Sequence, residues 1–215
     1  MPPPPDVIET AHGPLHLPVY FPDATRAVVR SVDSHDLESC GVQGVVVNVF
    51  HLSTRPGSGL IKRAGGIHRF MGWQRPVASD SGGFQLMSMI GENARYGTIS
   101  ERGIHFTDLD GARNKVLFTP ERSIQRQFDL GADLMICLDD CPSPDATAQE
   151  VEVAVERTIL WARRCRAEFD RLLETRHRGE GPCPLLFGVI QGGYEKALRA
   201  RCADELLRLG FDGFG

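Results

Sequence analysis

The sequence predicts an α/β fold built on a parallel sheet, and three observations lead to that prediction. Short apolar runs with the composition of buried strands alternate with runs whose apolar residues recur at helical spacing. Helix start signals stand between several of these runs. Polar residues follow the apolar runs directly, as they do at the edge of a parallel sheet that carries an active site.

Composition sets the outer limits on fold and function. The 215 residues, 41% apolar and 24% charged, suffice for one large or two small globular domains. Lys and Arg number 24 against 28 Asp and Glu; the net charge of −4 argues against a dedicated nucleic-acid-binding module but allows a local basic strip. No apolar run is long enough to span a membrane. The six cysteines form no Cys-x-x-Cys pair, so we expect reduced thiols in a cytoplasmic protein and no metal site within this chain.

The expected strands follow a proline-rich tail and lead-in at residues 1–16. Apolar, β-branched stretches bounded by turn-forming residues define the strands, which we place at residues 17–21, 44–50, 76–79, 133–138 and 185–190. Residues 44–50 are mostly apolar and rich in Val, which is typical of a strand buried on both faces. Residues 90–118 interrupt the alternation because they are Gly-rich and polar, so we expect a hairpin or a lid there.

Capping and stop signals define the helices between the strands. We place them at residues 34–40 after Asp33, at residues 120–130 after Thr119, in a long run after Thr147, and at residues 195–209. Thr147 and Glu150 form a capping box, and an apolar stripe from Val151 to Phe169 follows at helical spacing. The arginines of this long helix are interleaved with acidic residues, which favours a solvated face over an RNA-binding strip.

The stretch from Asp80 to Phe84 carries the strongest functional signal. Asp80 ends a strand, where it can act as a general acid/base or anchor a ligand N–H. Ser81 follows, and then Gly82 and Gly83, whose lack of a side chain lets the backbone come close to a ligand. Phe84 can stack on a planar ring. The alternative is a structural turn capped by the aspartate.

Two further strand ends carry polar side chains that suit a purine. Asp139 can accept N–H bonds from an amidine-like edge such as that of guanine; a divalent-metal site and a helix-capping loop are the alternatives. We expect its neighbour Asp140 to cap a helix or to be solvated. Gln191 can both donate and accept, which suits a purine carbonyl and ring nitrogen, against the alternative of a plain turn. Asn48 and His51 are more often packing or hydrogen-bonding residues than catalysts at such a place.

Taken in order, several stretches resemble the tRNA-guanine transglycosylase family, over about residues 17–215. They are Asn48-Val49-Phe50-His51-Leu52, Arg55-Pro56-Gly57, Phe70-Met71-Gly72-Trp73, Asp80 to Gln85, Leu109-Asp110-Gly111, Thr119-Pro120-Glu121-Arg122-Ser123, Asp139-Asp140-Cys141, Phe187-Gly188-Val189-Ile190-Gln191-Gly192 and Gly210-Phe211-Asp212-Gly213. Several such stretches in the family's order make a specific signal, whereas one alone would not.

The resemblance implies a (β/α)8 TIM barrel, of which residues 17–215 supply about the first five strands and the start of the sixth. It implies a glycosyltransferase of queuosine biosynthesis, which exchanges a guanine in tRNA for a 7-deazaguanine base through a covalent RNA–enzyme intermediate. Asp80 is then the catalytic acid/base that handles the ring proton of the base. The implied base-binding residues are Ser81, Gly82, Gly83, Phe84, Asp139 and Gln191.

Two departures from the family pattern leave alternatives open. The family's nucleophilic aspartate and its zinc ligands, three Cys and a His, lie beyond Gly215, so we expect a fragment, a split gene product or a truncated paralogue. Zinc then belongs to the missing C-terminal part, and the partners are tRNA, the guanine or 7-deazaguanine base, and a second copy or a partner chain that completes the barrel. The alternative functions are a non-catalytic subunit that binds the base and a paralogue that acts on DNA guanine. Asp23 raises the latter, because Pro22-Asp23-Ala24-Thr25 stands where the family commonly has Pro-Val-Gly-Thr, and its carboxylate would lie near the pocket wall.

Overall fold

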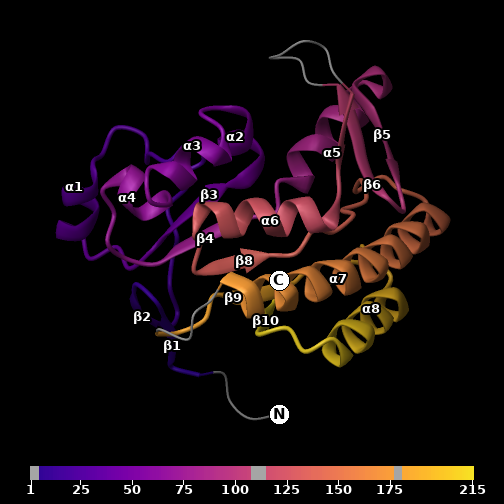
Figure 1. The fold of residues 1–215 in the computed structure, drawn as a ribbon. Helices are drawn as coiled ribbons and strands as arrows, with labels where there is room; N and C mark the ends of the chain where they lie inside the picture. The colour runs from indigo at the N-terminus through magenta and orange to yellow at the C-terminus, as the bar shows by residue number, and fades with distance from the viewer. Residues whose placement is uncertain (1–4, 108–114, 177–180) are drawn as a thin grey trace. The chain divides into compact units, whose positions relative to one another are not determined.

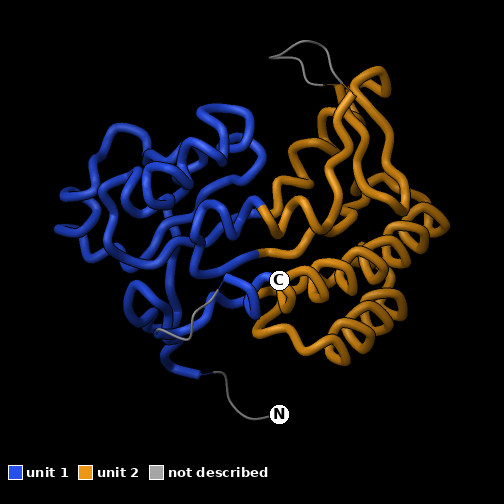
Figure 2. Tube along the Cα trace, in the orientation of Figure 1, with its two compact units in different colours: residues 1–80, 126–135, 172–185 blue, residues 81–125, 136–171, 186–215 orange. Residues whose placement is uncertain are grey.

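The computed structural model describes residues 5–107, 115–176 and 181–215. The chain divides into two compact units (Figure 2). Unit 1 comprises residues 1–80, 126–135 and 172–185, and unit 2 comprises residues 81–125, 136–171 and 186–215. Each unit has a fully buried tryptophan, Trp73 in unit 1 and Trp161 in unit 2.

A five-stranded sheet carries the parallel pairings of the fold (Figure 1). Its strands are β3 (Val45–Asn48), β4 (Val77–Asp80), β8 (Leu134–Ile136), β9 (Leu185–Gly188) and β10 (Gly213–Phe214), in the hydrogen-bonded order β10-β9-β8-β4-β3. The pairs β3–β4, β4–β8 and β9–β10 are parallel. The prediction of an α/β fold with a parallel sheet is confirmed, while the strands in the described part of the chain do not close into a barrel.

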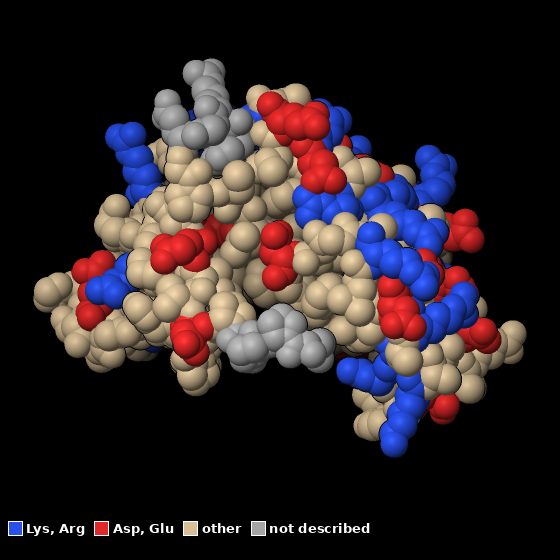
Figure 3. Space-filling model, turned by 90° about the horizontal axis from the view of Figure 1, so that it is seen from below, with Lys and Arg blue, Asp and Glu red and all other residues tan. Residues whose placement is uncertain are grey.

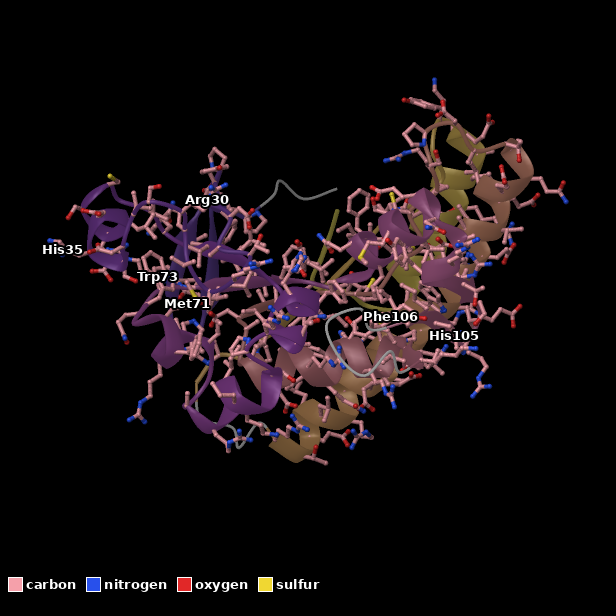
Figure 4. The ribbon with its side chains drawn as sticks, turned by 90° about the horizontal axis from the view of Figure 1, so that it is seen from above. Arg30, His35, Met71, Trp73, His105 and Phe106 are labelled. Carbon is pink, nitrogen blue, oxygen red and sulfur yellow. The ribbon has the colours of Figure 1, made fainter. Side chains whose placement is uncertain are left out.

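In unit 1, short elements surround β3 and β4. They are the antiparallel hairpin of β1 (Val7–Thr10) and β2 (Gly13–His16) and the helices α1 (Ser34–Ser39), α2 (Val49–Thr54), α3 (Ser58–Arg63) and α4 (Ile67–Met71). Val45, Val47 and Val77 are fully buried, which fits the preference of β-branched residues for buried strands. Trp73 lies close to Met71 just after α4 (Figure 4), and its Nε1 donates to the Pro76 carbonyl at 3.3 Å.

In unit 2, an antiparallel sheet and helices provide the framework. They are α5 (Gly83–Glu92), the 3-10 helix η1 (Ala94–Tyr96), β5 (Gly97–Ser100), β6 (Gly103–Thr107), β7 (Lys115–Phe118) and α8 (Lys196–Arg208), with the strands in the order β5-β6-β7. The helices α6 (Pro120–Leu130) and α7 (Ala148–Arg176) have residues in both units. Trp161 of α7 donates its Nε1–H to the Glu101 carbonyl at 2.9 Å, which ties α7 to the β5–β6 turn. His105 and Phe106 lie on β6 (Figure 4).

The helices that the capping signals predict are confirmed. Asp33 and Asp36 cap α1 reciprocally, and Thr147 and Glu150 do the same for α7, with Thr147 N–H to Glu150 Oε2 at 2.8 Å. The strands expected at 76–79, 133–138 and 185–190 are present as β4, β8 and β9, the last two shorter than expected. None of the described helices has the length and apolar character that crossing a bilayer requires.

Two sequence predictions need correction. The strand at residues 17–21 is wrong, since Pro18 has no N–H to give to a ladder, and only a single parallel bridge from Asp23 to Val46 follows. The strand expected over 44–50 ends at Asn48, because Asn48 caps a helix instead. The lead-in within 1–16 contains the β1–β2 hairpin. In the 90–118 insertion, β5 and β6 form a hairpin, while 108–114, with Leu109-Asp110-Gly111, lie outside the described residues.

Candidate functional site

Asp80 and Asn48 stand side by side in unit 1, at the carboxyl ends of β4 and β3. The register of the two parallel strands pairs them directly. The Oδ1 of Asn48 accepts the N–H groups of Phe50 at 3.0 Å and His51 at 3.3 Å, which caps α2. The side-chain amide of Asn48 also hydrogen-bonds to the Asp80 carboxylate. The cap thus fixes Asn48 so that its amide N–H is presented to Asp80.

The proton affinity of Asp80 is raised by its surroundings. Partial burial raises the pKa of Asp80 above its ordinary value, the hydrogen bond from Asn48 opposes that rise, and the negative charge of Asp23 adds to it. A carboxyl group that holds its proton more firmly than usual is suited to general acid/base chemistry near neutral pH. The position and electrostatics of Asp80 therefore suit the role expected of it.

Asp23 belongs to the same charged surroundings in unit 1. It pairs with Val46 at the edge of β3, and its Oδ1 accepts the Thr25 N–H at 2.9 Å, which fixes one carboxylate oxygen. Its charge acts on Asp80 and also on His51, where burial lowers the pKa and Asp23 partly opposes the change. The residue that departs from the family pattern therefore influences both neighbouring ionisable groups.

The Ser81-Gly82-Gly83 stretch begins unit 2 with a tightly packed turn. Gly82 has φ 80°, a left-handed conformation that favours glycine, and it caps α5. A Cβ at Gly83 would lie well inside van der Waals contact with Leu138 Cδ1. The Ser81 carbonyl accepts a hydrogen bond from Ser123 Oγ at 2.9 Å. The backbone therefore favours glycine at Gly82, and a side chain at Gly83 would require the Leu138 side chain to move.

Phe84 presents its ring to solvent on the first turn of α5. Its side chain is 61% exposed, although α5 buries Leu86 and Met87. A large apolar side chain at a site of this kind leaves a ring face open to stack on a planar ligand. Phe84 follows Asp80 by four positions in the chain, with the Ser81-Gly82-Gly83 turn between them.

Asp139 and Gln191 come together in unit 2, although 52 positions separate them in the chain. Gln191 Nε2 donates to Asp139 Oδ2 at 2.7 Å. The backbone N–H of Gln191 points at Cys202 Sγ at 3.4 Å, which fixes the start of the loop after β9. At Gly192, φ is 142° and a Cβ would lie 2.5 Å from the backbone N of Arg199, so the loop also requires glycine. The two residues expected to read one edge of a base thus face one another.

Asp140 has a structural role that differs from the expected one. It is buried and forms an ion pair with Arg157 of α7, and its N–H donates to Thr158 Oγ1 at 3.0 Å. Burial raises the pKa of Asp140, and the Arg157 charge opposes the rise. The expectation of a capping or solvated Asp140 is wrong, because its partner on α7 could not be identified from local sequence.

The described residues contain one group of three metal-ligating side chains at close range, His12, His68 and Asp133 of unit 1. No sequence motif indicates this group, because His12 and His68 lie 121 and 65 positions from Asp133 in the chain. The group lies at the start of β8, where Asp133 also accepts the Val77 N–H at 2.9 Å. It is therefore found at the amino end of β4, and Asp80 at the carboxyl end.

The basic residues of α7 and α8 form an ion-pair network within unit 2. Figure 3 shows Lys and Arg gathered over this side of the molecule with acidic residues between them. Arg163 pairs with Glu205 at 2.6 Å, and Arg164 pairs with Glu121 at 2.7 Å. Interleaved charges of this kind favour a solvated face over a uniformly basic strip.

Comparisons with known proteins agree on one family. The family described as "Queuine tRNA-ribosyltransferase" matches residues 6–215. Curated proteins named queuine tRNA-ribosyltransferase are 38% identical in Halothermothrix orenii over 208 residues, 96% of this chain and 52% of the relative, and 37% identical in Lysinibacillus sphaericus over 209 residues, 97% and 51%. The relative in Novosphingobium aromaticivorans is 38% identical over 208 residues, 96% and 53%. The chain spans about half the length of the curated relatives it matches.

Proposed function

The chain belongs to the queuine tRNA-ribosyltransferase family, and on this premise we propose that it is the base-binding part of an enzyme that exchanges guanine in tRNA for a 7-deazaguanine base. The relatives' name states a tRNA substrate and a ribosyl transfer. The proposal adds which residues of this chain bind the base and which one handles its proton.

The observation that carries the proposal is the hydrogen bond between Gln191 and Asp139. The polar edge of guanine offers N–H donors beside a carbonyl acceptor. A carboxylate accepts from the donors and an amide NH2 donates to the carbonyl, so the pair matches that edge in the type of its hydrogen-bonding groups. Adenine has no carbonyl and, on the corresponding edge, has N–H donors only on its amino group, so it cannot give the carboxylate two adjacent N–H groups while the amide binds a carbonyl.

The remaining residues have roles consistent with a planar base. Asp80, with its raised pKa and its hydrogen bond from Asn48, is the proposed catalytic residue that takes or gives the ring proton. Ser81, Gly82 and Gly83 let the backbone approach the base, and Phe84 stacks on it. These roles concern the base alone and not the sugar or the rest of the tRNA.

The roles of the complete enzyme extend beyond this chain. We propose that the five-stranded sheet is part of a (β/α)8 barrel and that the protein works in the cytoplasm, with a second copy or a partner chain completing the site. Within the described residues, no cysteine belongs to a group of three metal-ligating side chains. We propose that the zinc of the family is bound by residues outside this chain.

Calorimetric titration of this chain with 7-deazaguanine tests base binding directly. Saturable binding is expected for 7-deazaguanine and not for adenine, and Asp139→Ala should abolish it. Glu205→Ala on α8 is a matched control, because it removes an acid of the ion-pair network in the same unit. Equal binding of both bases, or unchanged binding by Asp139→Ala, would contradict the proposal.

Exchange of labelled guanine into tRNA by the complete gene product tests the reaction. Asp80→Asn should abolish exchange while leaving base binding measurable, since it keeps the shape and removes the titratable group. Base binding without exchange in the wild-type protein would favour a non-catalytic subunit. A competition of tRNA against DNA decides the polymer, which the unusual Asp23 leaves open.

A further inference from the structure

One carboxylate of unit 1 is shared by two stacked imidazole rings. Asp133 Oδ1 accepts from His12 Nδ1 at 2.8 Å, and Asp133 Oδ2 accepts from His68 Nε2 at 3.0 Å. The two rings lie face to face, with centroids 3.4 Å apart and planes inclined by 11°. The Asp133 side chain is 1% exposed. The proposed function gives none of these three residues a role.

The geometry of this cluster fits protons better than a metal ion. A metal bound by an imidazole nitrogen lies near the plane of that ring, along its lone pair. Because the His12 and His68 rings are nearly parallel and 3.4 Å apart, their lone pairs do not converge on one point. The two oxygens of one carboxylate can instead accept one N–H from each ring, as the two short distances show.

The cluster fastens three separate elements together. His12 lies in the turn of the β1–β2 hairpin, His68 lies on α4, and Asp133 immediately precedes β8. Asp133 Oδ2 also accepts the N–H of Val77 at 2.9 Å, which attaches the start of β4. A further link of the hairpin is the pair of hydrogen bonds between the His16 backbone and the side chain of Gln43. Leu15 of β2 is also fully buried, so the His12 contact is what holds the turn of the hairpin.

Charge balance limits how many protons the cluster can hold. Burial alone would raise the pKa of Asp133, but hydrogen bonds from His68, His12 and the Val77 N–H outweigh burial and hold the pKa below its ordinary value. The carboxylate is therefore ionised at neutral pH, and its single negative charge can balance one protonated ring but not two. Two protonated rings would leave a net positive charge and place like charges face to face.

Neighbouring charges and solvent exposure indicate which of the two rings would separate from Asp133 if both were protonated. Arg176 lines, together with His12 and Asp133, a cavity of about 270 Å³, so the charged groups around this cavity include a further cation. Arg176 is itself bonded to Asp129 at 2.8 Å, and Asp129 also binds Lys62 at 2.7 Å. The side chain of His12 is 35% exposed and that of His68 is 10% exposed. His12 can therefore reach water more easily.

We propose that His12, Asp133 and His68 form an acid-released clamp on the N-terminal hairpin. While no more than one ring is protonated, both rings stay on the carboxylate and the hairpin is held. When acidification protonates the second ring, His12 leaves the stack and the turn of the hairpin loses its attachment. This release requires no ligand and is independent of base binding.

Hydrogen exchange of the hairpin amides, expressed as protection factors, tests the clamp. In the wild-type chain, protection of residues 7–16 should fall by about tenfold or more between about pH 7.5 and about pH 5. In His12→Gln, protection should be low at both pH values. In His68→Gln, a single titrating ring remains, so protection should persist at the lower pH.

His35→Gln is the matched control, because His35 is an exposed histidine of α1 in the same unit (Figure 4) and should leave the pH response unchanged. Equal protection of the wild-type hairpin at both pH values would overturn the clamp. A fall in protection between about pH 7.5 and about pH 5 in His12→Gln or His68→Gln, as large as that of the wild-type chain, would also overturn it. A rise in protection on adding Zn²⁺, reversed by a chelator, would replace the clamp by a metal site.

Discussion

Gln191 donates its Nε2–H to Asp139 Oδ2 at 2.7 Å, so the two side chains that suit a purine edge already satisfy one another. A ligand must replace the hydrogen bond that it breaks, because leaving a buried polar group unpaired is costly. Guanine and 7-deazaguanine can give N–H groups to the Asp139 carboxylate and a carbonyl to the Gln191 amide at the same time. The pair therefore favours bases that carry both kinds of group.

A change of charge at Gln191 should eliminate this selection. Gln191→Glu keeps the shape but places a second carboxylate against Asp139, which removes the donor for the base carbonyl and adds like-charge repulsion. We expect base affinity to fall by about 100-fold or more, measured by calorimetry. Gln149→Glu makes the same change at an exposed position of α7 and should leave affinity unchanged. Full affinity in Gln191→Glu would remove Gln191 from the base site.

Substituting alanine for each of two glycines of α5 should change the free energy of unfolding in opposite directions. Gly83→Ala drives its Cβ into Leu138 Cδ1 and should lower the free energy of unfolding by about 1–3 kcal/mol. Gly91→Ala, in the same helix, meets nothing within 4 Å and should raise it by about 0.5–1 kcal/mol. Urea denaturation of both variants measures the two effects. Equal effects would show that helix propensity, and not packing, decides at Gly83.

At neutral pH, the ionised Asp80 side chain should destabilise the folded state. Its pKa is raised in the folded state, so the protonated form is the favourable one, and that benefit is lost as pH rises through the folded pKa. Asp80→Asn should therefore be slightly more stable than the wild-type chain at about pH 7, with the difference shrinking toward acid. Thermal unfolding across pH measures this difference. A variant less stable than wild type at neutral pH would contradict the raised pKa.

The capping box of α7 should contribute to stability through one hydroxyl group. Thr147 Oγ1 accepts the Glu150 N–H at 3.3 Å, so Thr147→Ala leaves that N–H without its partner. A loss of about 1 kcal/mol in the free energy of unfolding is expected, and Thr147→Ser should restore most of it. If Ser and Ala destabilise equally, the lost methyl packing of Thr147 is responsible and not the cap.

The sequence predicted the elements whose determinants are local. The start of α7 depends on Thr147 and Glu150, which are three residues apart, and the start of α1 depends on Asp33 and Asp36 in the same way. Asn48 was placed inside a strand because it follows three valines, although its side chain caps α2. The helices α2, α3 and α4 have five or six residues each, too few to show a helical period.

Contacts between residues far apart in the chain could not be predicted from the sequence, because they depend on how the elements pack. Ordering the strands of a sheet made Asp139 and Gln191 plausible neighbours, but only their loops bring them to hydrogen-bonding distance. The ion pair of Asp140 with Arg157 depends on how α7 packs, which no local signal encodes. His12 and Asp133 are 121 positions apart, and neither stands in a pattern that indicates its partner.

The single strand β4 has opposite acid–base tendencies at its two ends. Its four residues span about 13 Å, from Val77, whose N–H binds a carboxylate with a lowered pKa, to Asp80, whose own pKa is raised. As acidity increases, Asp80 therefore becomes neutral before Asp133 does. The strand therefore has a fixed order of neutralisation. Its amino end at Val77 stays hydrogen-bonded to the ionised Asp133 at a pH at which Asp80, at its carboxyl end, has already lost its charge.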